Sequence, residues 1–391
     1  MSGFQNIKSF IERNKNNHES GYYNCIPFDV FPRFEKLVPG IIQGMQYILT
    51  GSSGCAKSKI SRFMFLHHPY HYVEKHPELG IEVDIHYFSL EESREKIYLS
   101  ELSRVLKTKH GLSVSVNQLR SIGKNNTIPR TLFSKIDECE KEVNVFMNKI
   151  KIYGKEESNP TGVYKTMRDV AHKTGKYFHK SGHLFTEYEM NQIKNSHGEI
   201  YKDIGGFKLN NPRHYIICLF DNINIMKGEK GLSEYECINK LSTDYFLDTK
   251  SMFKQINVIV QQQTAEKEKQ EFTSRGQSIE EKLEPSKDGL AINKSTFNDA
   301  EFVLGIFNPA RYGIKEHAGF DIQKLHDNYR SLSILKNRDD YEGYKIPLFF
   351  DGACDYFKEL PRQKDNPNYQ NQITEIYKYA KELYDSRQNN V

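Results

Sequence analysis

The stretch GSSGCAKS occupies residues 51–58, between the apolar run Tyr47-Ile48-Leu49 and the largely apolar segment 60–66. A phosphate-binding loop has a Gly, four further residues, and then Gly-Lys-Ser or Gly-Lys-Thr. This stretch differs from that pattern only at Ala56, which stands where the second glycine is expected. In such a loop the backbone N–H groups surround the phosphates of a nucleotide, the Lys ammonium reaches the terminal phosphates, and the hydroxyl binds Mg²⁺. The predicted nucleotide-binding residues are therefore Gly51, Ser52, Ser53, Gly54, Cys55, Ala56, Lys57 and Ser58, with Ser58 also a metal ligand.

The methyl group of Ala56 interferes only if the backbone there needs a positive φ or approaches a phosphate very closely. Gly51 and Gly54 keep the turn flexible, and Lys57-Ser58 opens the next apolar segment. A helix beginning there adds its dipole to anion binding. The alternative is an ordinary strand-turn-helix corner.

The composition is that of a soluble, mildly basic protein of 391 residues, with a net charge of +4 and 27% charged residues. This length allows one large domain or two, and the charge is too small to indicate nucleic-acid binding by itself. The sequence has no run of 18 apolar residues and no signal-peptide core at its beginning, so we expect a cytoplasmic protein without a membrane segment. Six scattered cysteines without a Cys-x-x-Cys pair indicate reduced thiols.

The histidine-rich stretch HHPYH, residues 67–71, raises the question of a metal site. No acidic or Cys residue stands at ligand spacing from these histidines, and we expect Pro69 to break the helix that carries them. The sequence therefore predicts no metal site at this stretch.

Short, nearly continuous apolar runs alternate with helical patterns along most of the chain. We expect helices at 58–68 and 92–106, and strands at 46–50, 83–88, 215–220, 256–260, 301–307, 332–336 and 345–350. This alternation predicts an α/β fold with a mostly parallel twisted sheet flanked by helices on both faces. Residues 110–180 are expected to be mostly helical, and 181–213 to form an exposed insertion.

Both ends of the chain are expected to be helical additions to this core. Residues 1–21 comprise a short amphipathic helix and a polar linker, with Phe4, Ile7, Phe10 and Ile11 at helical spacing. Residues 22–361 form the predicted ATPase-like domain, and 362–391 form a helical tail.

Polar residues end several predicted strands. Asp221 closes an apolar strand, as a Mg²⁺-binding carboxylate does in nucleotide hydrolases. Glu91 ends another strand, where a carboxylate can activate water, whereas Glu92 suits a helix N-terminus. Gln263 ends a third strand and is a candidate γ-phosphate sensor. Lys336 and Arg338 end a fourth, and Arg delivered to a neighbour's nucleotide is a recurring way to stabilise phosphoryl transfer.

In this order, the motifs resemble the RecA-like ATPase domain of DnaB-family replicative hexameric DNA helicases over about residues 22–361. The resembling stretches are CIPFDVFPRFEKLVPGIIQGMQYILTG, FSLEES, IICLFDNINIM, VIVQQQ, DAEFVLGIF and ILKNRDDYEGYKIPLFFDGACDYFKEL. The resemblance implies ATP and Mg²⁺ as cofactors, single-stranded DNA as a partner, a homo-oligomer such as a hexameric ring, and a primase or helicase loader as a further partner. A phage-type member fits best.

The resemblance also implies roles for individual residues. Lys57 and Ser58 would hold phosphate and Mg²⁺, Asp221 would hold Mg²⁺, and Gln263 would sense the γ-phosphate. Glu91 would activate water, with Lys336 and Arg338 acting across a subunit interface. Lys267, Lys269 and Arg275 follow Gln263 in the expected DNA loop, but the acidic residues among them nearly cancel their charge.

Three departures accompany the resemblance. Ala56 replaces the loop glycine, the family's acidic-Arg-Glu-Ser-Gly stretch is not visible in KDGLAINKSTFN, and only about 20 residues precede the core. Two other functions therefore stay open. One is a non-motor RecA-fold ATPase, recombinase-like or regulatory, that assembles on DNA or a protein partner. The other is a structural protein that keeps the fold without turnover.

Overall fold

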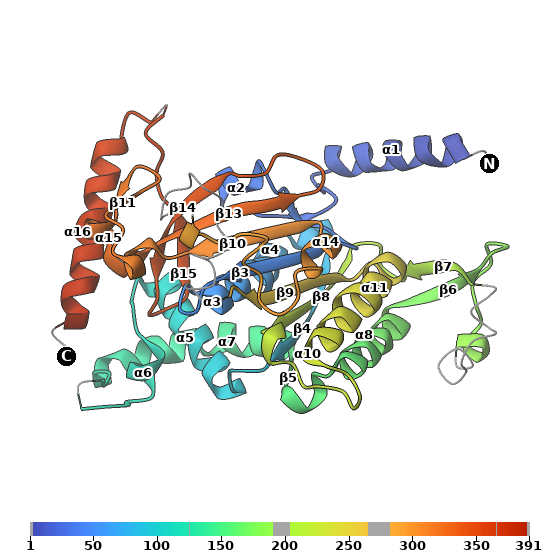
Figure 1. The fold of residues 1–391 in the computed structure, drawn as a ribbon, viewed down its shortest axis with the longest axis horizontal. Coiled ribbons are helices and arrows are strands. Elements are labelled where there is room, and N and C mark those ends of the chain that lie inside the picture. Colours follow the sequence, from blue (N-terminus) through green and yellow to red (C-terminus); the bar gives the residue numbers. More distant parts are fainter. Residues whose placement is uncertain (1–2, 125, 191–203, 265–281, 365, 389–391) are drawn as a thin grey trace.

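The computed structural model describes residues 3–124, 126–190, 204–264, 282–364 and 366–388. Their centre is a large twisted sheet with helices around it (Figure 1). Across this nine-stranded sheet the order is β15 (Tyr356–Glu359), β14 (Lys345–Asp351), β13 (Tyr329–Asn337), β10 (Phe302–Phe307), β3 (Gln46–Gly51), β9 (Ile256–Gln262), β8 (His214–Asp221), β4 (Glu82–Ser89) and β5 (Ile150–Tyr153). Strands β10, β3, β9, β8, β4 and β5 pair in parallel. Strands β13, β14 and β15 extend the β10 edge in antiparallel fashion. The predicted mostly parallel α/β sheet is confirmed.

Helices cover both faces of the sheet, which explains why the central strands β3, β9 and β8 are buried at nearly every position. Tyr47 and Leu49 of β3 pack into one core and Ile48 into the other. The first core includes α3 (Lys57–Arg62), α4 (His68–Lys75), α5 (Arg94–His110) and α7 (Phe133–Lys149). The second includes α8 (Pro160–Thr174), α10 (Glu234–Asn239) and α11 (Phe246–Phe253). All six cysteines are buried and free.

The helical run after the loop continues through Pro69, so the expected break there is wrong. A π-helical segment, Phe63–His67, joins α3 to α4, and Pro69 lies in the first turn of α4. Just before Pro69 the N–H of His68 bonds to the carbonyl of Phe63, five residues back, and this wider π turn changes the hydrogen-bond ladder where proline lacks an N–H. Acidic partners for the histidines come from distant segments. His67 lies 2.7 Å from Glu101.

The segment 110–180 is helical in large part, through α6 (Val116–Leu119), α7 and α8. It also contains β5, which the sequence analysis missed because it follows α7 directly, without a turn residue between them. In the expected insertion, β7 (Ile204–Leu209) pairs with β6 (Gly175–His179) as an antiparallel arm at one end of the molecule (Figure 1). Residues 191–203 of that insertion lie outside the described residues.

Smaller elements connect this framework. They are β1 (Ile26–Pro27) paired with β2 (Gly40–Ile41), β11 (Glu316–His317) paired with β12 (Phe320–Asp321), and the short helices α2 (Pro32–Glu35), α14 (Thr296–Asp299) and α15 (Ile322–Leu325).

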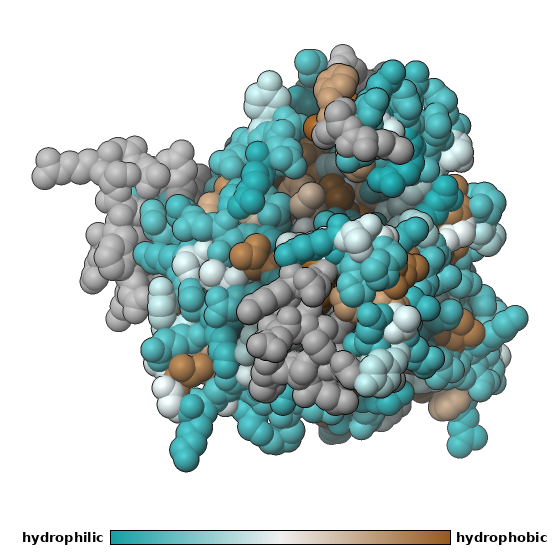
Figure 2. All heavy atoms as spheres, turned by 90° about the vertical axis from the view of Figure 1, so that its right-hand side faces the viewer, coloured by the Kyte–Doolittle hydropathy of each residue, from teal (hydrophilic) through white to brown (hydrophobic). Residues whose placement is uncertain are grey.

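Helices also lie at the two ends of the described chain. Helix α1 (Gly3–Glu19) projects from the core, whereas α16 (Tyr369–Gln388) packs along its opposite side (Figure 1). The face on the α1 side is largely hydrophilic, with hydrophobic side chains in small scattered groups (Figure 2). None of the described helices combines the length and apolarity needed to cross a membrane.

Candidate active site

Four parallel neighbours, β3, β9, β8 and β4, bring the predicted site residues to one edge of the sheet. The loop follows β3, Asp221 ends β8, Glu91 follows β4, and the glutamines end β9. The strand registers align these ends, because Gly51 pairs with Gln262 and Asp221 pairs with Ser89. Ligands of parallel sheets commonly bind at this carboxyl edge.

The loop backbone has the strained conformation that makes glycine useful. A Cβ on Gly51 would lie 2.4 Å from the carbonyl oxygen of Ile306, so only glycine fits there. Gly54 has φ of +74° and Ala56 has φ of +80°, both in the left-handed region. Ala56 therefore occupies a conformation that costs a residue with a Cβ about 1 to 2 kcal/mol. It directly precedes α3, whose first N–H groups have no intrahelical partner and can bind an anion.

Lys57, Ser58 and Asp221 form the core of the site. The ammonium of Lys57 donates to the carbonyl of Ser52 at 3.0 Å, so this side chain folds back over the loop. The Ser58 hydroxyl donates to Oδ1 of Asp221 at 3.1 Å, and Tyr87 donates to Oδ2 at 3.2 Å. Burial raises the pKa of Asp221 to about 6, while Arg62 and the Ser58 hydroxyl act in the opposite direction.

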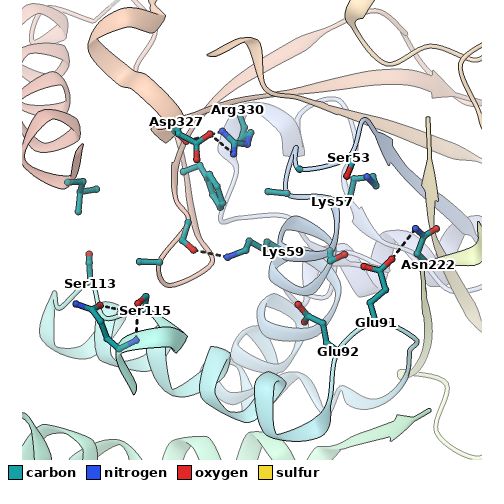
Figure 3. Close-up of a pocket in the computed structure, with 18 of the residues that line it drawn as sticks. Ser53, Lys57, Lys59, Glu91, Glu92, Ser113, Ser115, Asn222, Asp327 and Arg330 are labelled. Carbon is teal, nitrogen blue, oxygen red and sulfur yellow. Dashed lines mark hydrogen bonds and ion pairs between the residues drawn. The ribbon is translucent and has the colours of Figure 1, made fainter. Parts of the chain in front are cut away.

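The two glutamates that follow β4 have different partners in the structure. Glu92 is held by Arg62, and its other oxygen lies 2.8 Å from Lys96. Glu91 points into the cavity, where Nδ2 of Asn222 donates to its carboxylate at 3.4 Å (Figure 3). Both carboxylates line the cavity, but Glu92 is neutralised by two cations, whereas the hydrogen-bond partner of Glu91 is the neutral amide of Asn222.

A cavity of about 860 Å³ opens over the loop (Figure 3). Its lining combines predicted residues with residues that the sequence analysis did not single out. The predicted ones are Ser53, Gly54, Ala56, Lys57, Ser58 and Glu91, and the others include Asn222, Gln262, Asp327, Arg330 and Phe350. Asp221 accepts the hydrogen bond from Ser58 beside this lining and is almost fully buried.

The glutamines of β9 point in different directions. Gln262 lines the cavity. Gln263 is buried and donates to the Thr50 hydroxyl at 2.9 Å and to the Ser286 carbonyl at 3.0 Å. Since successive side chains of a strand alternate between its two faces, only one of the pair can face the nucleotide. In the structure Gln262 faces the cavity, and the predicted Gln263 is turned towards Thr50 and Ser286.

Arg330 of β13 is hydrogen-bonded to the phosphate-binding loop. Its Nε donates to the carbonyl of Cys55 at 3.0 Å, and its NH2 donates to the carboxylate of Asp327 at 3.1 Å. The guanidinium also lies 4.4 Å from the ring centroid of Phe350. Arg330 is the second residue of β13, and the signal in the sequence is a cation just before the expected strand 332–336.

Lys336 and Arg338 lie at the opposite edge of the sheet from the loop. Lys336 pairs in register with Val303, near the beginning of β10. The Lys336 ammonium donates to the carbonyl of Phe297 at 2.7 Å. Arg338 lies 3.2 Å from Glu301 and is half exposed. The structure therefore does not bring these two cations to the loop of the same chain. The predicted DNA residues Lys267, Lys269 and Arg275 lie outside the described residues.

The residues of the site fit a nucleotide with a divalent cation. Ser58 and Asp221 present a hydroxyl and a carboxylate oxygen side by side, and oxygen ligands are those that Mg²⁺ prefers. Lys57 and the beginning of α3 supply positive charge and N–H donors for phosphate. Bound nucleotide would replace the contact between Lys57 and Ser52 with one to phosphate.

No protein-family model matches the amino-acid sequence, and no curated protein matches it. Solved structures do match. A DnaB-like replicative helicase, studied with its interactions with primase, superposes with a TM-score of 0.56 at 14% identity, over 84% of this chain and 62% of that one. The ATPase domain of G40P superposes with a TM-score of 0.56 at 13% identity, over 91% of this chain and 99% of that one. The chain thus spans less than two thirds of the first protein, and its fold is the RecA-like fold of the ATPase domains of such helicases.

Proposed function

We propose that this protein is an ATP-hydrolysing ring motor that translocates on single-stranded DNA and unwinds duplex DNA in replication. The observation that carries the proposal is the convergence of Lys57, Ser58, Glu91 and Asp221 at the carboxyl ends of adjacent parallel strands. These are the groups that phosphoryl transfer from a nucleotide to water requires.

Each group has a role that its geometry supports. Lys57 and the N–H groups at the start of α3 hold the phosphates, and Ser58 and Asp221 hold Mg²⁺, which supplies charge stabilisation when bound. Glu91 takes a proton from the attacking water, because its carboxylate lines the cavity and, within the described part of the chain, contacts a neutral amide and no cation. Gln262 is the glutamine placed to sense the γ-phosphate.

The distant position of Lys336 and Arg338 supports action between subunits. A cation at the edge opposite its own loop can reach a nucleotide only if a second copy presents its loop there. A closed ring satisfies this condition for every subunit. Arg338 is half exposed, and its contacts with Glu301 and Asn298 are those of a side chain that can be redirected at an interface.

Single-stranded DNA would occupy the ring channel, where Lys267, Lys269 and Arg275 remain the predicted contacts. The similar replicative helicase interacts with primase, and we propose a primase or a helicase loader as a further partner of this chain. A homo-oligomer, such as a hexamer, is part of the same proposal. The cytoplasm is the compartment that suits these partners.

The test is the ATPase rate of mixed variants in the presence of single-stranded DNA. Arg338→Ala protein should bind ATP normally but hydrolyse it about 10³-fold or more slowly, the size of effect measured for trans arginines. Lys57→Ala protein should lose nucleotide binding. Mixing the two should restore activity, because a subunit with an intact loop can sit beside one with an intact Arg338.

A rate that rises and then falls with mixing ratio supports shared sites. A flat rate at the level of the inactive parents, with mixed assemblies confirmed by sedimentation, would contradict the motor. Hydrolysis without any dependence on Arg338 would instead support a non-motor RecA-fold ATPase.

A further inference from the structure

The cavity extends well beyond the loop, to a second wall that phosphate binding does not need. Ser113, Ser115 and Gln118, around the beginning of α6, line it, and Leu383 and Ser386 of α16 line it as well. Figure 3 places Ser113 and Ser115 on the side of the cavity away from Ser53 and Lys57. We call these five residues the far wall.

Helix α16 is fixed to the core by apolar packing and by hydrogen bonds. Ile373 and Ala380 pack with Tyr329 and Phe349 of the sheet. The Tyr379 hydroxyl accepts a hydrogen bond from Lys107 and lies 3.1 Å from the hydroxyl of Ser113. Hydrogen bonds therefore connect α16 to α5 and to the segment between α5 and α6, which holds the two parts of the far wall together.

A second contact ties α16 to the segment that braces the loop. The ring of Tyr384 stacks on His326 with centroids 4.0 Å apart. His326 directly precedes Asp327, whose carboxylate accepts from Arg330, and Arg330 donates to the loop carbonyl of Cys55. The position of α16 is thus linked to the position of the phosphate-binding loop through adjacent residues.

The chemistry of the far wall differs from that of the loop. The five residues are uncharged, whereas Lys57 and the beginning of α3 supply the positive charge and N–H donors that a phosphate needs. Gln118 uses its Oε1 to accept from Ser115, which leaves its amide N–H groups as donors towards the cavity. Ser386 donates to the carbonyl of Leu383 at 2.9 Å, which leaves its oxygen as an acceptor. Leu383 adds apolar surface to the far wall.

We propose that the far wall binds the nucleoside part of the nucleotide, with Leu383 of α16 packed against the base. The charged end of a nucleoside triphosphate belongs at the loop, and its base presents a flat apolar surface with donor and acceptor groups along the edge. Gln118 and Ser386 offer the complementary donor and acceptor. This inference rests on the proposed ATP site, and it makes the C-terminal helix part of that site.

The experiment compares ATP with inorganic tripolyphosphate, which lacks a nucleoside, by calorimetric titration of the full chain in Mg²⁺. Leu383→Ala should weaken ATP binding by roughly 10-fold, the effect of lost apolar contact in a binding pocket, and leave tripolyphosphate binding unchanged. Gln118→Ala should have the same selective effect. Lys57→Ala should weaken the binding of both ligands.

Lys381→Ala is the matched control, since Lys381 is exposed on the same helix and does not line the cavity. It should bind both ligands as the wild type does. Leu383→Ala and Gln118→Ala proteins that bind ATP with wild-type affinity would overturn the inference, and so would equal weakening of ATP and tripolyphosphate. Wild-type protein that binds neither ligand would overturn the proposed ATP site as well, which separates the two failures.

Discussion

The hydroxyl of Ser58 donates a hydrogen bond of 3.1 Å to Oδ1 of Asp221, although the two residues are 163 positions apart in the chain. Ser58 lies in the first turn of α3 and Asp221 is the last residue of β8. The contact places a hydroxyl and a carboxylate where one metal ion could contact both, directly or through a water molecule.

Asp221→Asn is expected to raise the Mg²⁺ concentration needed for half-maximal ATP hydrolysis by about 10- to 100-fold, because the amide carries no charge to hold the ion. Titration of the ATPase rate with Mg²⁺ measures this shift. Asp84→Asn is the control, since Asp84 lies nearer the other end of β4 beside His214. An unchanged Mg²⁺ requirement in Asp221→Asn would remove Asp221 from the metal site.

Glu91→Gln is expected to bind ATP but to hydrolyse it about 10² to 10⁴ times more slowly, since a positioned general base is lost. Glu92→Gln should retain hydrolysis and lose about 1 to 3 kcal/mol of unfolding free energy, because buried Arg62 loses one of its carboxylate partners. Single-turnover rates and urea unfolding of both variants measure the two effects. The reverse pattern would make Glu92 the base.

Ala56→Gly is expected to stabilise the protein by about 1 kcal/mol, because glycine adopts the positive φ of this position without the Cβ penalty. Urea unfolding of the nucleotide-free protein tests this. Ala171→Gly within α8 makes the same chemical change in a helix and should destabilise by about 1 kcal/mol or more. Equal destabilisation by both changes would show that Ala56 is not strained.

Asp355 is buried between two cations, with Lys59 and Arg62 each 2.7 Å from one of its oxygens. Burial alone would raise the pKa of Asp355, but Lys59 and Arg62 hold it below its usual value. Asp355→Asn should therefore lower the unfolding free energy at pH 7 by about 3 to 5 kcal/mol, since the cations lose their carboxylate.

The pH dependence of stability in the wild type and in Asp355→Asn tests the same ion pairs. A carboxylate whose folded pKa is lowered stabilises the fold above its unfolded pKa of about 3.9 and loses that contribution as the pH falls further. The difference between wild type and Asp355→Asn should be constant from pH 7 to about pH 5 and should narrow below about pH 4. Exposed Asp385→Asn should change stability by less than about 0.5 kcal/mol throughout. A difference independent of pH would contradict the role of the charge.

Helix α1 exposes Phe4, Ile7, Phe10 and Ile11, each by more than half of its surface. We predict that this stripe docks on an adjacent subunit. Phe10→Ser combined with Ile11→Ser should weaken oligomer assembly in sedimentation experiments and leave the thermal unfolding of the core unchanged. Lys15→Ala, on the same helix, should assemble normally. A double variant with an unchanged oligomer would show that α1 does not hold the assembly together.

The sequence alone determined the order of the motifs and the strands of the large sheet other than β5 and β15. Residues 47–49 and 215–220 are continuous apolar runs, which are typical of strands covered on both faces. The loop and Asp221 follow these strands directly, so their meeting at one sheet edge followed from the parallel arrangement. Ala56 was likewise visible as the one departure from the loop pattern, and the structure supplied its positive φ.

Only the tertiary structure decided which neighbouring residues face the cavity and which segments complete it. Gln262 and Gln263 are adjacent amides, and the alternation of side chains along the chain, rather than their chemistry, places Gln262 at the cavity. Glu91 and Glu92 differ in their partners, because Arg62 of α3 and Lys96 of α5 form ion pairs with Glu92. Arg330 and Leu383 reach the site from segments more than 270 residues beyond the loop. Such contacts depend on long-range packing, which a local sequence pattern does not encode.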